Sequence, residues 1–260
     1  MKLHRRYVEK PWGCTQLPPM FDQPAGKRIG EVWFTNGADL PLLAKYIFTS
    51  ERLSIQVHPN DEQAHARGLA QGKSECWYIL DAEPAATLGL GLKRSVARED
   101  LRKAALDGSI EQLIDWKPVR AGDFVFVPSG TVHAIGAGIS LLEFQQNADV
   151  TYRLYDYGRP RELHLDDGVA VSSPEPFPNE LMQHLSGNEE RTLVEGPHFT
   201  LLLTKTDALA DRVRWVLPLD GEVRSGGSSA GAGDCLLLKG GEALECSGAR
   251  MLIGATARRS

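Results

Sequence analysis

Residues 53–61 read LSIQVHPND, a short alternating stretch that ends at Pro59 and Asn60-Asp61. Strand side chains point to opposite faces with a period of two. One face is therefore expected to be aliphatic, with Leu53, Ile55 and Val57. The other face carries a hydroxyl, an amide and an imidazole in a row, on Ser54, Gln56 and His58. In a closed barrel such a polar face lines solvent or a cavity, so this stretch predicts a β-structure able to enclose a site.

Similar short strands, separated by Gly and Pro turns, lie on both sides of this stretch. We expect strands at 42–48, 52–58, 76–80, 123–128, 139–145 and 150–155. Their spacing predicts an antiparallel sandwich or barrel. One segment, 96–116, instead has apolar residues at helical spacing and is interrupted at Asp107-Gly108. It predicts one or two short helices inserted between strands.

The second half repeats part of the first. After a Pro- and Ser-rich connection at 172–180, we expect strands at 199–205, 213–219 and 234–246. AGDFVFVPSGTVHA at 121–134 and AGDCLLLKGGEALE at 232–245 share an Ala-Gly-Asp turn followed by four apolar residues. Aligning the two triplets puts His133 opposite Leu244. The repeat predicts two related β-barrels, of which only the first carries a polar site.

The composition excludes several classes of function. The chain has 260 residues, a formal net charge of -5 and four cysteines without a CxxC pair. It has no basic field for a nucleic-acid backbone, no secretory signal and no apolar run long enough to span a bilayer. We therefore expect a cytoplasmic protein with free thiols that binds neither nucleic acid nor membranes. Nothing in the sequence indicates an oligomeric state.

Two further segments add candidate metal ligands to the polar face of 53–61. Glu75 opens an otherwise apolar strand in GKSECWYIL (72–80), and a carboxylate facing a core must be paired or metal-bound. His133 lies in an apolar run after a turn at 128–130. With Gln56 and His58 they offer an N/O set that Zn²⁺ accepts. The structural alternatives are a solvated strand face, an edge charge and a satisfied core histidine.

The segment ISLLEFQQNADVTYRLYDYGR (139–159) holds the remaining candidates. Asp149 and Arg153 alternate with apolar residues and share one face, and Glu143 lies in the middle of a strand. A structural ion pair between Asp149 and Arg153 is the simpler interpretation. The functional interpretation is an acid/base carboxylate with a cation for an anionic intermediate or a phosphate.

In this order, LLAKYIFTSERLSIQVHPND, GKSECWYIL, VPSGTVHAIG and EFQQNADVTYRLYDYGR resemble the type I phosphomannose isomerases of the cupin superfamily. KPWG (10–13) and GEVWF (30–34) are similar to that family's first strands. The resemblance implies a mainly β fold of two cupin (jelly-roll) β-barrels, with the helical additions reduced to 96–116 as in compact bacterial-type members. It implies a catalytic metal-binding domain at 1–165, then a linker and a second, non-metal domain at 166–260.

The resemblance also implies a set of functional residues. The expected zinc ligands are Gln56, His58, Glu75 and His133. The expected active-site positions are Lys45, Ser54, Lys73, Glu143, Asp149 and the arginine Arg153. The activity implied is a zinc-dependent interconversion of mannose 6-phosphate and fructose 6-phosphate through an enediol, with a small phosphorylated sugar as the partner molecule.

The roles of these residues are expectations from the chemistry. For the proton-transferring base we favour Glu143 or Asp149, with Lys73 as a third candidate. Arg153 would stabilise the enediolate, and Lys45 and Ser54 could meet the phosphate. Two other classes of function stay open, a metal-dependent cupin oxygenase and a non-catalytic sugar-binding cupin.

Overall fold

A computed structural model describes residues 1–187 and 189–258, and most of its regular structure is β-strand. The largest sheet has seven strands in the order β1-β2-β3-β10-β5-β8-β12. These strands are β1 (His4–Cys14), β2 (Ile29–Thr35), β3 (Leu42–Thr49), β10 (Ile139–Gln146), β5 (Glu75–Ala82), β8 (Asp123–Val127) and β12 (Met182–His184). All residues of β3 are buried, including its one charged residue, Lys45, so this sheet has other layers on both faces.

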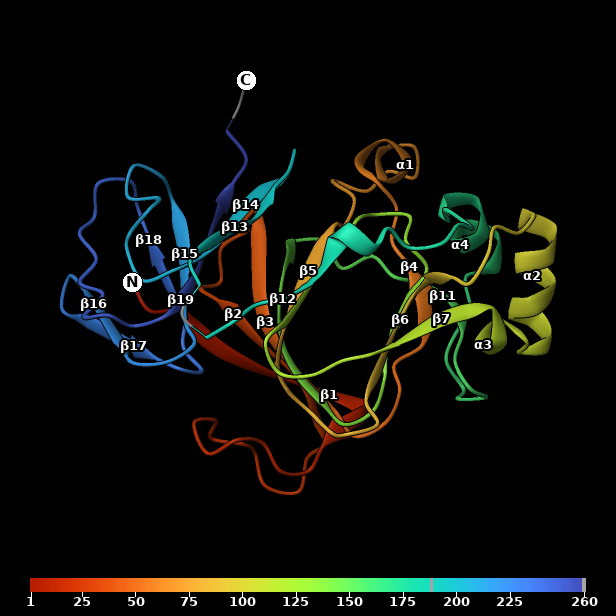
Figure 1. Ribbon diagram of the computed structural model, residues 1–260, viewed down its shortest axis with the longest axis horizontal. Helices are drawn as coiled ribbons and strands as arrows, with labels where there is room; N and C mark the ends of the chain where they lie inside the picture. The colour runs from red at the N-terminus through yellow and green to blue at the C-terminus, as the bar shows by residue number, and fades with distance from the viewer. Residues whose placement is uncertain (188, 259–260) are drawn as a thin grey trace.

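A second sheet has five strands in the order β11-β4-β9-β6-β7 and faces the first sheet (Figure 1). Its strands are β11 (Tyr152–Tyr155), β4 (Ile55–Val57), β9 (His133–Ile135), β6 (Thr87–Leu92) and β7 (Ile114–Pro118). An apolar core that includes Trp77, Ile79 and Leu90 fills part of the space between the two sheets. The functional site occupies another part of the same space.

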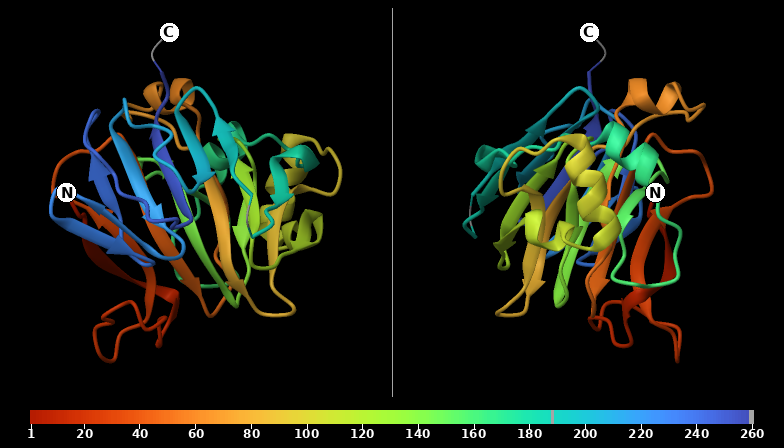
Figure 2. Two further views of the ribbon diagram at one scale, coloured as in Figure 1. Left: turned by 60° about the vertical axis from the view of Figure 1, so that its left-hand side comes forward. Right: turned by 90° about the vertical axis from the view of Figure 1, so that its right-hand side faces the viewer.

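Helices cover the outer face of the second sheet, as the right-hand view of Figure 2 shows. They are α2 (Arg98–Asp107), α3 (Ile110–Leu113) and α4 (Leu165–Val171). The predicted helical segment 96–116 is thus confirmed as two short helices, and the break is a left-handed Gly108 with φ 82°. Its last residues, 114–116, belong to β7 instead. Two further short helices are α1 (Asp61–His65) and the 3₁₀ helix η1 (Asn179–Leu181).

The third sheet packs against the opposite face of the seven-stranded sheet and has the order β13-β14-β19-β15-β18. Its strands are β13 (Arg191–Glu195), β14 (Phe199–Thr204), β19 (Met251–Thr256), β15 (Arg214–Pro218) and β18 (Leu236–Leu238), and a hairpin of β16 (Glu222–Ser225) and β17 (Ser228–Gly231) accompanies it. The amino-terminal residues join the two sheets, because Leu3 N–H donates to Cys235 O at 2.9 Å and Leu237 N–H donates to Met1 O at 2.9 Å.

The two Ala-Gly-Asp turns of the repeat have the same local geometry. Gly122 and Gly233 have φ values of 88° and 89°. Asp123 accepts a hydrogen bond from Arg120 N–H at 2.9 Å, and Asp234 accepts one from Gly231 N–H at 3.1 Å. The strands that follow the two turns differ in length, and the strand predicted at 234–246 is wrong in extent. Only 236–238 form a strand, and Glu245 makes an isolated bridge to Arg224.

The mainly β class is confirmed, and the strands expected at 42–48, 76–80, 123–128, 139–145, 199–205 and 213–219 form with small changes of length. In the part of the chain that the structure describes, the sheets stack face to face and none closes into a barrel. Within residues 1–187 and 189–258, no helix combines the length and apolar character needed to cross a bilayer.

The alternation predicted for 53–58 needs one correction. β4 begins only at Ile55, and Leu53 N–H has already donated to Ile135 O at 2.8 Å. Leu53 therefore packs in the core between the sheets, whereas Ile55 and Val57 pack under the helices. Ser54 and Gln56 keep the predicted direction and line the cavity between the sheets.

Candidate functional site

A polar cavity of about 340 Å³ lies between the seven-stranded and the five-stranded sheet. It collects most of the residues that the sequence singles out. Those that line it are Lys45, Ser54, Gln56, Lys73, Glu75, Glu143, Asp149 and Arg153. His58 and His133 are fully buried beside Glu75. The pattern along β11 is as predicted, since Asp149, Thr151 and Arg153 face the cavity and Val150, Tyr152 and Leu154 face the helical layer.

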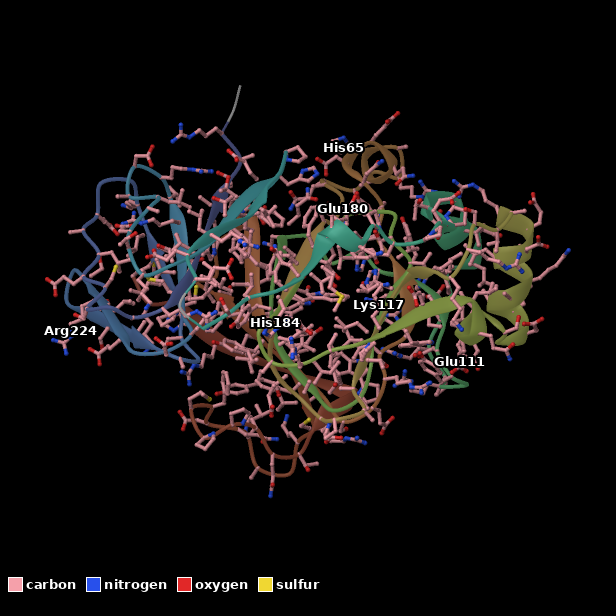
Figure 3. All side chains as sticks on the ribbon, in the orientation of Figure 1. His65, Glu111, Lys117, Glu180, His184 and Arg224 are labelled. Atoms are coloured by element: carbon pink, nitrogen blue, oxygen red, sulfur yellow. The ribbon has the colours of Figure 1, made fainter. Side chains whose placement is uncertain are left out.

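Three buried residues form a group that could hold a metal ion. The ligand atoms of His58, Glu75 and His133 all lie within 4.8 Å of one another. Nε2 of His58 is 3.4 Å from Glu75 Oε2, and Nε2 of His133 is 3.4 Å from Glu75 Oε1. His65 on α1 and His184 on β12, both labelled in Figure 3, lie outside this group.

The backbone fixes which edge of each imidazole faces the group. His58 Nδ1 is 2.7 Å from Val150 O, and His133 Nδ1 is 2.9 Å from Thr131 O. A carbonyl oxygen only accepts hydrogen bonds, so each Nδ1 carries the proton and each neutral ring turns an Nε2 lone pair towards Glu75. Burial, reinforced by the Lys73 ammonium, lowers the pKa of His58 to about 3. Burial also lowers the pKa of His133.

Glu75 is ionised at the centre of this group. Burial alone would raise its pKa, but the neighbouring Lys73 ammonium outweighs burial and holds the pKa well below the ordinary value. Its Oε2 lies 2.7 Å from Lys73 Nζ, yet no hydrogen bond of good geometry reaches that oxygen. Two imidazole lone pairs and a carboxylate directed at one point fit a divalent cation, and nitrogen and oxygen donors are those that Zn²⁺ accepts.

Gln56, the fourth predicted ligand, lies beside the group with its amide nitrogen inward. Its Nε2 is 3.3 Å from His133 Nε2, and its Oε1 accepts a hydrogen bond from Ser54 Oγ at 3.1 Å. A half-turn of the amide about its last bond exchanges the two atoms. Gln56 offers an oxygen ligand only after that rotation, and the Ser54 hydroxyl, which can donate or accept, could then accept from the amide nitrogen.

Alternating charges continue from the metal-capable group along the cavity wall. Lys73 Nζ is 2.7 Å from Glu75, and Lys45 Nζ is 3.0 Å from Glu143 Oε1 and 3.5 Å from Glu31 Oε1. Burial and the Glu75 charge raise the pKa of Glu143, and the two lysines oppose this rise. Burial would also raise the pKa of Glu31, but the Lys45 and Lys10 ammonium groups lower it to about 2. Each of these lysines is therefore already neutralised by a carboxylate.

Arg153 and Asp149 differ from this network. Arg153 lies opposite Gln56 in the β11–β4 ladder, and its backbone is held from both sides by His164. Among residues 1–187 and 189–258, its guanidinium has no hydrogen bond or ion pair, and the Asp149 carboxylate has none either. The ion pair between them that served as the structural alternative is not formed. Arg153 thus contributes an uncompensated positive charge to the cavity.

Sequence reasoning missed the part of the cavity wall that comes from β1, β2 and the segment after β11. The missed lining residues include Lys10, Glu31, Trp33, Arg161 and His164. The sequence held a signal for Glu31, because it lies two residues from Trp33 in a predicted strand and so shares its face. In the structure, Trp33 Nε1 donates a hydrogen bond to Glu31 Oε2 at 2.9 Å. Arg161 had none, since its place depends on a bidentate bond to the buried Asp156.

Comparisons with known proteins show that this chain is similar to one group of enzymes. No family model matches the chain. The chain is 41% identical over 175 residues to the mannose-6-phosphate isomerase ManA of Bacillus subtilis, which covers 64% of this chain and 55% of that protein. It is 40% identical over 169 residues to the mannose-6-phosphate isomerase of Streptococcus mutans, covering 62% and 53%. The chain spans about half the length of the curated relatives it matches.

Solved structures extend the similarity to nearly the whole fold. The crystal structure of the mannose 6-phosphate isomerase from Bacillus subtilis superposes with a TM-score of 0.80 at 26% identity, covering 97% of this chain and 98% of that chain. A zinc-bound mannose 6-phosphate isomerase superposes with a TM-score of 0.69 at 15% identity, covering 99% of both chains, which is a likeness of fold alone. The comparison with the Bacillus subtilis structure agrees with the resemblance that the sequence motifs indicate.

Proposed function

We propose that this chain, a relative of the type I mannose-6-phosphate isomerases, is a zinc-dependent aldose–ketose isomerase that interconverts mannose 6-phosphate and fructose 6-phosphate. The observation that carries the proposal is the buried His58–Glu75–His133 group next to a cavity with the unpaired cation Arg153. The names of the curated relatives and of the zinc-bound neighbour support the substrate and the metal.

The reaction needs two things from the site. A proton moves between C1 and C2 through an enediol, so a base must reach both carbons, and the charge that develops on the sugar oxygens must be stabilised. His58, Glu75 and His133, with Gln56 after rotation of its amide, would hold Zn²⁺. When bound, Zn²⁺ supplies a Lewis acid for the oxygens at C1 and C2.

For the base we favour Glu143 or Asp149, with Lys73 as a third candidate. Glu143 lies between Lys45 and Trp77, whose Nε1 donates to its Oε2 at 3.1 Å. Its Oε1 forms the ion pair with Lys45 at 3.0 Å and has no other partner at hydrogen-bond distance in the described part of the chain, which leaves a lone pair for a substrate proton. Asp149 is exposed in the cavity and has no partner there. Lys73 is buried, with its Nζ 2.7 Å from Glu75 Oε2.

Arg153 is proposed to stabilise the enediolate. Its guanidinium need not break an existing ion pair before it binds an anion. None of its interaction energy with the developing charge is therefore spent on separating it from another partner. Lys45 already pairs with Glu143 and Glu31, and Ser54 already donates a hydrogen bond to Gln56. A contact of either residue with the phosphate would therefore be made in addition to these bonds or in place of them. A small phosphorylated sugar is the proposed partner molecule.

We extend the proposal to the organisation of the chain. The two facing sheets are proposed to act as one cupin barrel, residues 1–165 as the metal-binding domain, and residues 166–260 as a linker with a second, metal-free cupin-like domain. The pairing of β12 with β8 attaches part of that linker to the first domain. The cytoplasm is the proposed compartment, because Cys14, Cys76, Cys235 and Cys246 are free thiols.

A coupled assay tests the function. Purified protein is given mannose 6-phosphate, and the formation of fructose 6-phosphate is followed through a dehydrogenase, before and after treatment with a chelator. We expect activity that disappears with the metal and returns with Zn²⁺. Full activity in protein shown to be metal-free by elemental analysis would refute the zinc dependence, and no turnover of the zinc-loaded protein would refute the isomerase.

One alternative is favoured by a specific observation. Two histidines and one carboxylate also make up the facial triad of non-haem iron oxygenases. Oxygen consumption by the iron-loaded protein in the presence of small organic acids or sugars, without isomerase activity, would support that alternative.

A further inference from the structure

The short loop that carries Lys73 is attached to the start of α1. Lys73 N–H donates to Pro59 O at 2.9 Å, and Gly72 N–H donates to Asp61 Oδ1 at 2.8 Å. The contact is so close that a Cβ at Gly72 would lie 2.4 Å from the carbonyl carbon of Asn60. Only glycine fits there without movement of the backbone, so the loop packs directly against the backbone at the start of α1.

Gln146, the last residue of β10, holds the same loop from the other side. Its Nε2 donates to Asp61 Oδ1 at 2.9 Å, and its Oε1 accepts a hydrogen bond from Ser74 N–H at 2.9 Å. Its backbone N–H donates to Ser74 O at 3.1 Å. Gln146 is only 4% exposed, so these bonds have little competition from water. The peptide groups before and after Lys73 are thereby fixed.

Lys73 has a side chain that needs such support. Its Nζ lies 2.7 Å from Glu75 Oε2 and 3.2 Å from His58 Nε2, between two of the metal-capable residues. A lysine side chain is long and flexible, so the position of its ammonium group depends on where its Cα is held. Displacements of the order of 1 Å at a reacting centre are costly to turnover.

We propose that Asp61, acting with Gln146, is a positioning residue that holds the Lys73 ammonium in the active site. This inference rests on the proposed isomerase function for its kinetic consequence. Asp61 does not contact the substrate cavity, and it acts through one oxygen, Oδ1, which accepts both the Gly72 and the Gln146 hydrogen bonds.

The chain offers variants that separate this role from a general loss of structure. Asp61→Asn keeps an Oδ1 acceptor, whereas Asp61→Ala removes it. His198→Ala is a matched control, because His198 Nδ1 faces the other oxygen, Oδ2, at 3.5 Å and does not touch the loop. We expect Asp61→Ala to lower kcat about tenfold with less than about a twofold change in KM. Asp61→Asn and His198→Ala keep kcat close to the unchanged protein.

A double-mutant cycle that combines Asp61→Ala with Lys73→Met decides whether Asp61 affects kcat through Lys73. If Asp61 acts by placing the ammonium, Asp61→Ala changes kcat by less than about twofold once that ammonium is absent. Bound zinc per chain stays the same in Asp61→Ala and in the unchanged protein. An equal loss of kcat in both backgrounds, an unchanged kcat in Asp61→Ala, or a loss of zinc in that variant would overturn the proposal.

Amide hydrogen exchange tests the clamp independently of turnover. The amides of Gly72 and Ser74 are expected to exchange at least about tenfold faster in Asp61→Ala, but not in Asp61→Asn or His198→Ala. Unchanged exchange in Asp61→Ala would overturn the clamp. If the unchanged protein lacked isomerase activity but showed this exchange pattern, the proposed function would fail and the clamp would stand.

Discussion

His58 and His133 lie against Glu75 in an arrangement that is unfavourable without a positive charge between them. Each ring keeps its Nδ1 proton on a backbone carbonyl and so faces the carboxylate with a lone pair. In the protein alone, Lys73 approaches His58 Nε2 at 3.2 Å and the Gln56 amide approaches His133 Nε2 at 3.3 Å. Two donors thus face the positions at which a cation would bind, which ties Lys73 and Gln56 to the same site.

Arg153 is the residue whose removal should affect turnover most selectively. Since its guanidinium has no polar partner in the described part of the chain, Arg153→Ala breaks no side-chain hydrogen bond or ion pair, and the backbone bonds to His164 remain. We expect kcat to fall by about a hundredfold or more, with bound zinc and thermal stability unchanged. Steady-state kinetics, elemental analysis and a melting curve on one preparation check this. Unchanged turnover would remove Arg153 from the mechanism.

Glu31 should give the protein a measurable dependence of stability on pH. Its pKa is lowered from 4.5 to about 2, since the charges of Lys45 and Lys10 outweigh the effect of burial. A carboxyl whose pKa is lower in the folded state stabilises that state above its unfolded pKa, and this contribution is lost as the pH falls through 4.5 towards 2. Complete protonation removes about 3 kcal/mol.

Urea unfolding of Glu31→Gln measures this contribution. The difference in unfolding free energy between the unchanged protein and the variant should shrink by about 2 kcal/mol between about pH 6 and about pH 3. Glu9→Gln is the control, because Glu9 forms only a surface pair with Lys27. A difference for Glu31→Gln that stays constant over this range would contradict the prediction.

At the scale of elements, alternation along a strand predicted side-chain direction well wherever a ladder continues. In β11 the cavity face and the helix face separate as expected, and Glu75 shares its side of β5 with the core residues Trp77 and Ile79. Leu53 fails because it precedes β4 and its N–H donates to Ile135 O, so it packs between the sheets instead of continuing the face of Ile55 and Val57. His58 was predicted from the alternation of its strand, whereas Glu75 and His133 were predicted as polar residues in apolar runs, where a buried polar group needs a partner.

Short elements with capping signals were harder to predict. Asn60 ends the strand as expected, but it also begins α1 through a capping box with Gln63. That helix has only five residues, too few for a periodic apolar pattern. The members of the cavity wall from β1 and β2 were missed for another reason. Their place depends on the pairing of distant strands, which no local pattern encodes.

The break between α2 and α3 provides a test at this scale. Gly108 ends α2 with φ 82°, a left-handed conformation, and the hydroxyl of Tyr155 lies 3.0 Å from the position of an added Cβ. Gly108→Ala should lower the free energy of unfolding by about 1–2 kcal/mol. Gly231→Ala is the matched control, with no left-handed φ and one neighbour at 3.5 Å. Equal effects of the two substitutions on urea unfolding would contradict this.

For the whole molecule, the seven-stranded sheet is the shared layer that connects the site to the carboxy-terminal sheet. Neighbouring residues of β10 divide between its faces. Glu143 turns into the cavity, and Phe144 packs against Phe199 and Trp215 of the third sheet with ring centroids 5.3 Å and 6.2 Å away. The third sheet thus supports the strand that carries a candidate base, which gives the carboxy-terminal part of the chain a role in positioning the site.

The closest approach between these two layers can be tested directly. A Cβ at Gly254 of β19 would lie 2.3 Å from Cζ of Phe144, and the ring cannot move aside because Phe199 and Trp215 confine it. Gly254→Ala should therefore force the sheets apart and lower the free energy of unfolding by about 1–3 kcal/mol. Because β10 moves with Phe144, kcat should fall as well.

Phe144→Leu removes the end of the ring and so makes room for that methyl group. The double variant should lose less stability than the sum of the two single variants, with a coupling of at least about 1 kcal/mol, and it should recover part of the kcat lost in Gly254→Ala. Urea unfolding and steady-state kinetics on the four proteins measure both quantities. Strict additivity would show that the two sheets do not meet at this point. Coupled stabilities with an unchanged kcat would instead show that the position of Glu143 does not depend on the third sheet.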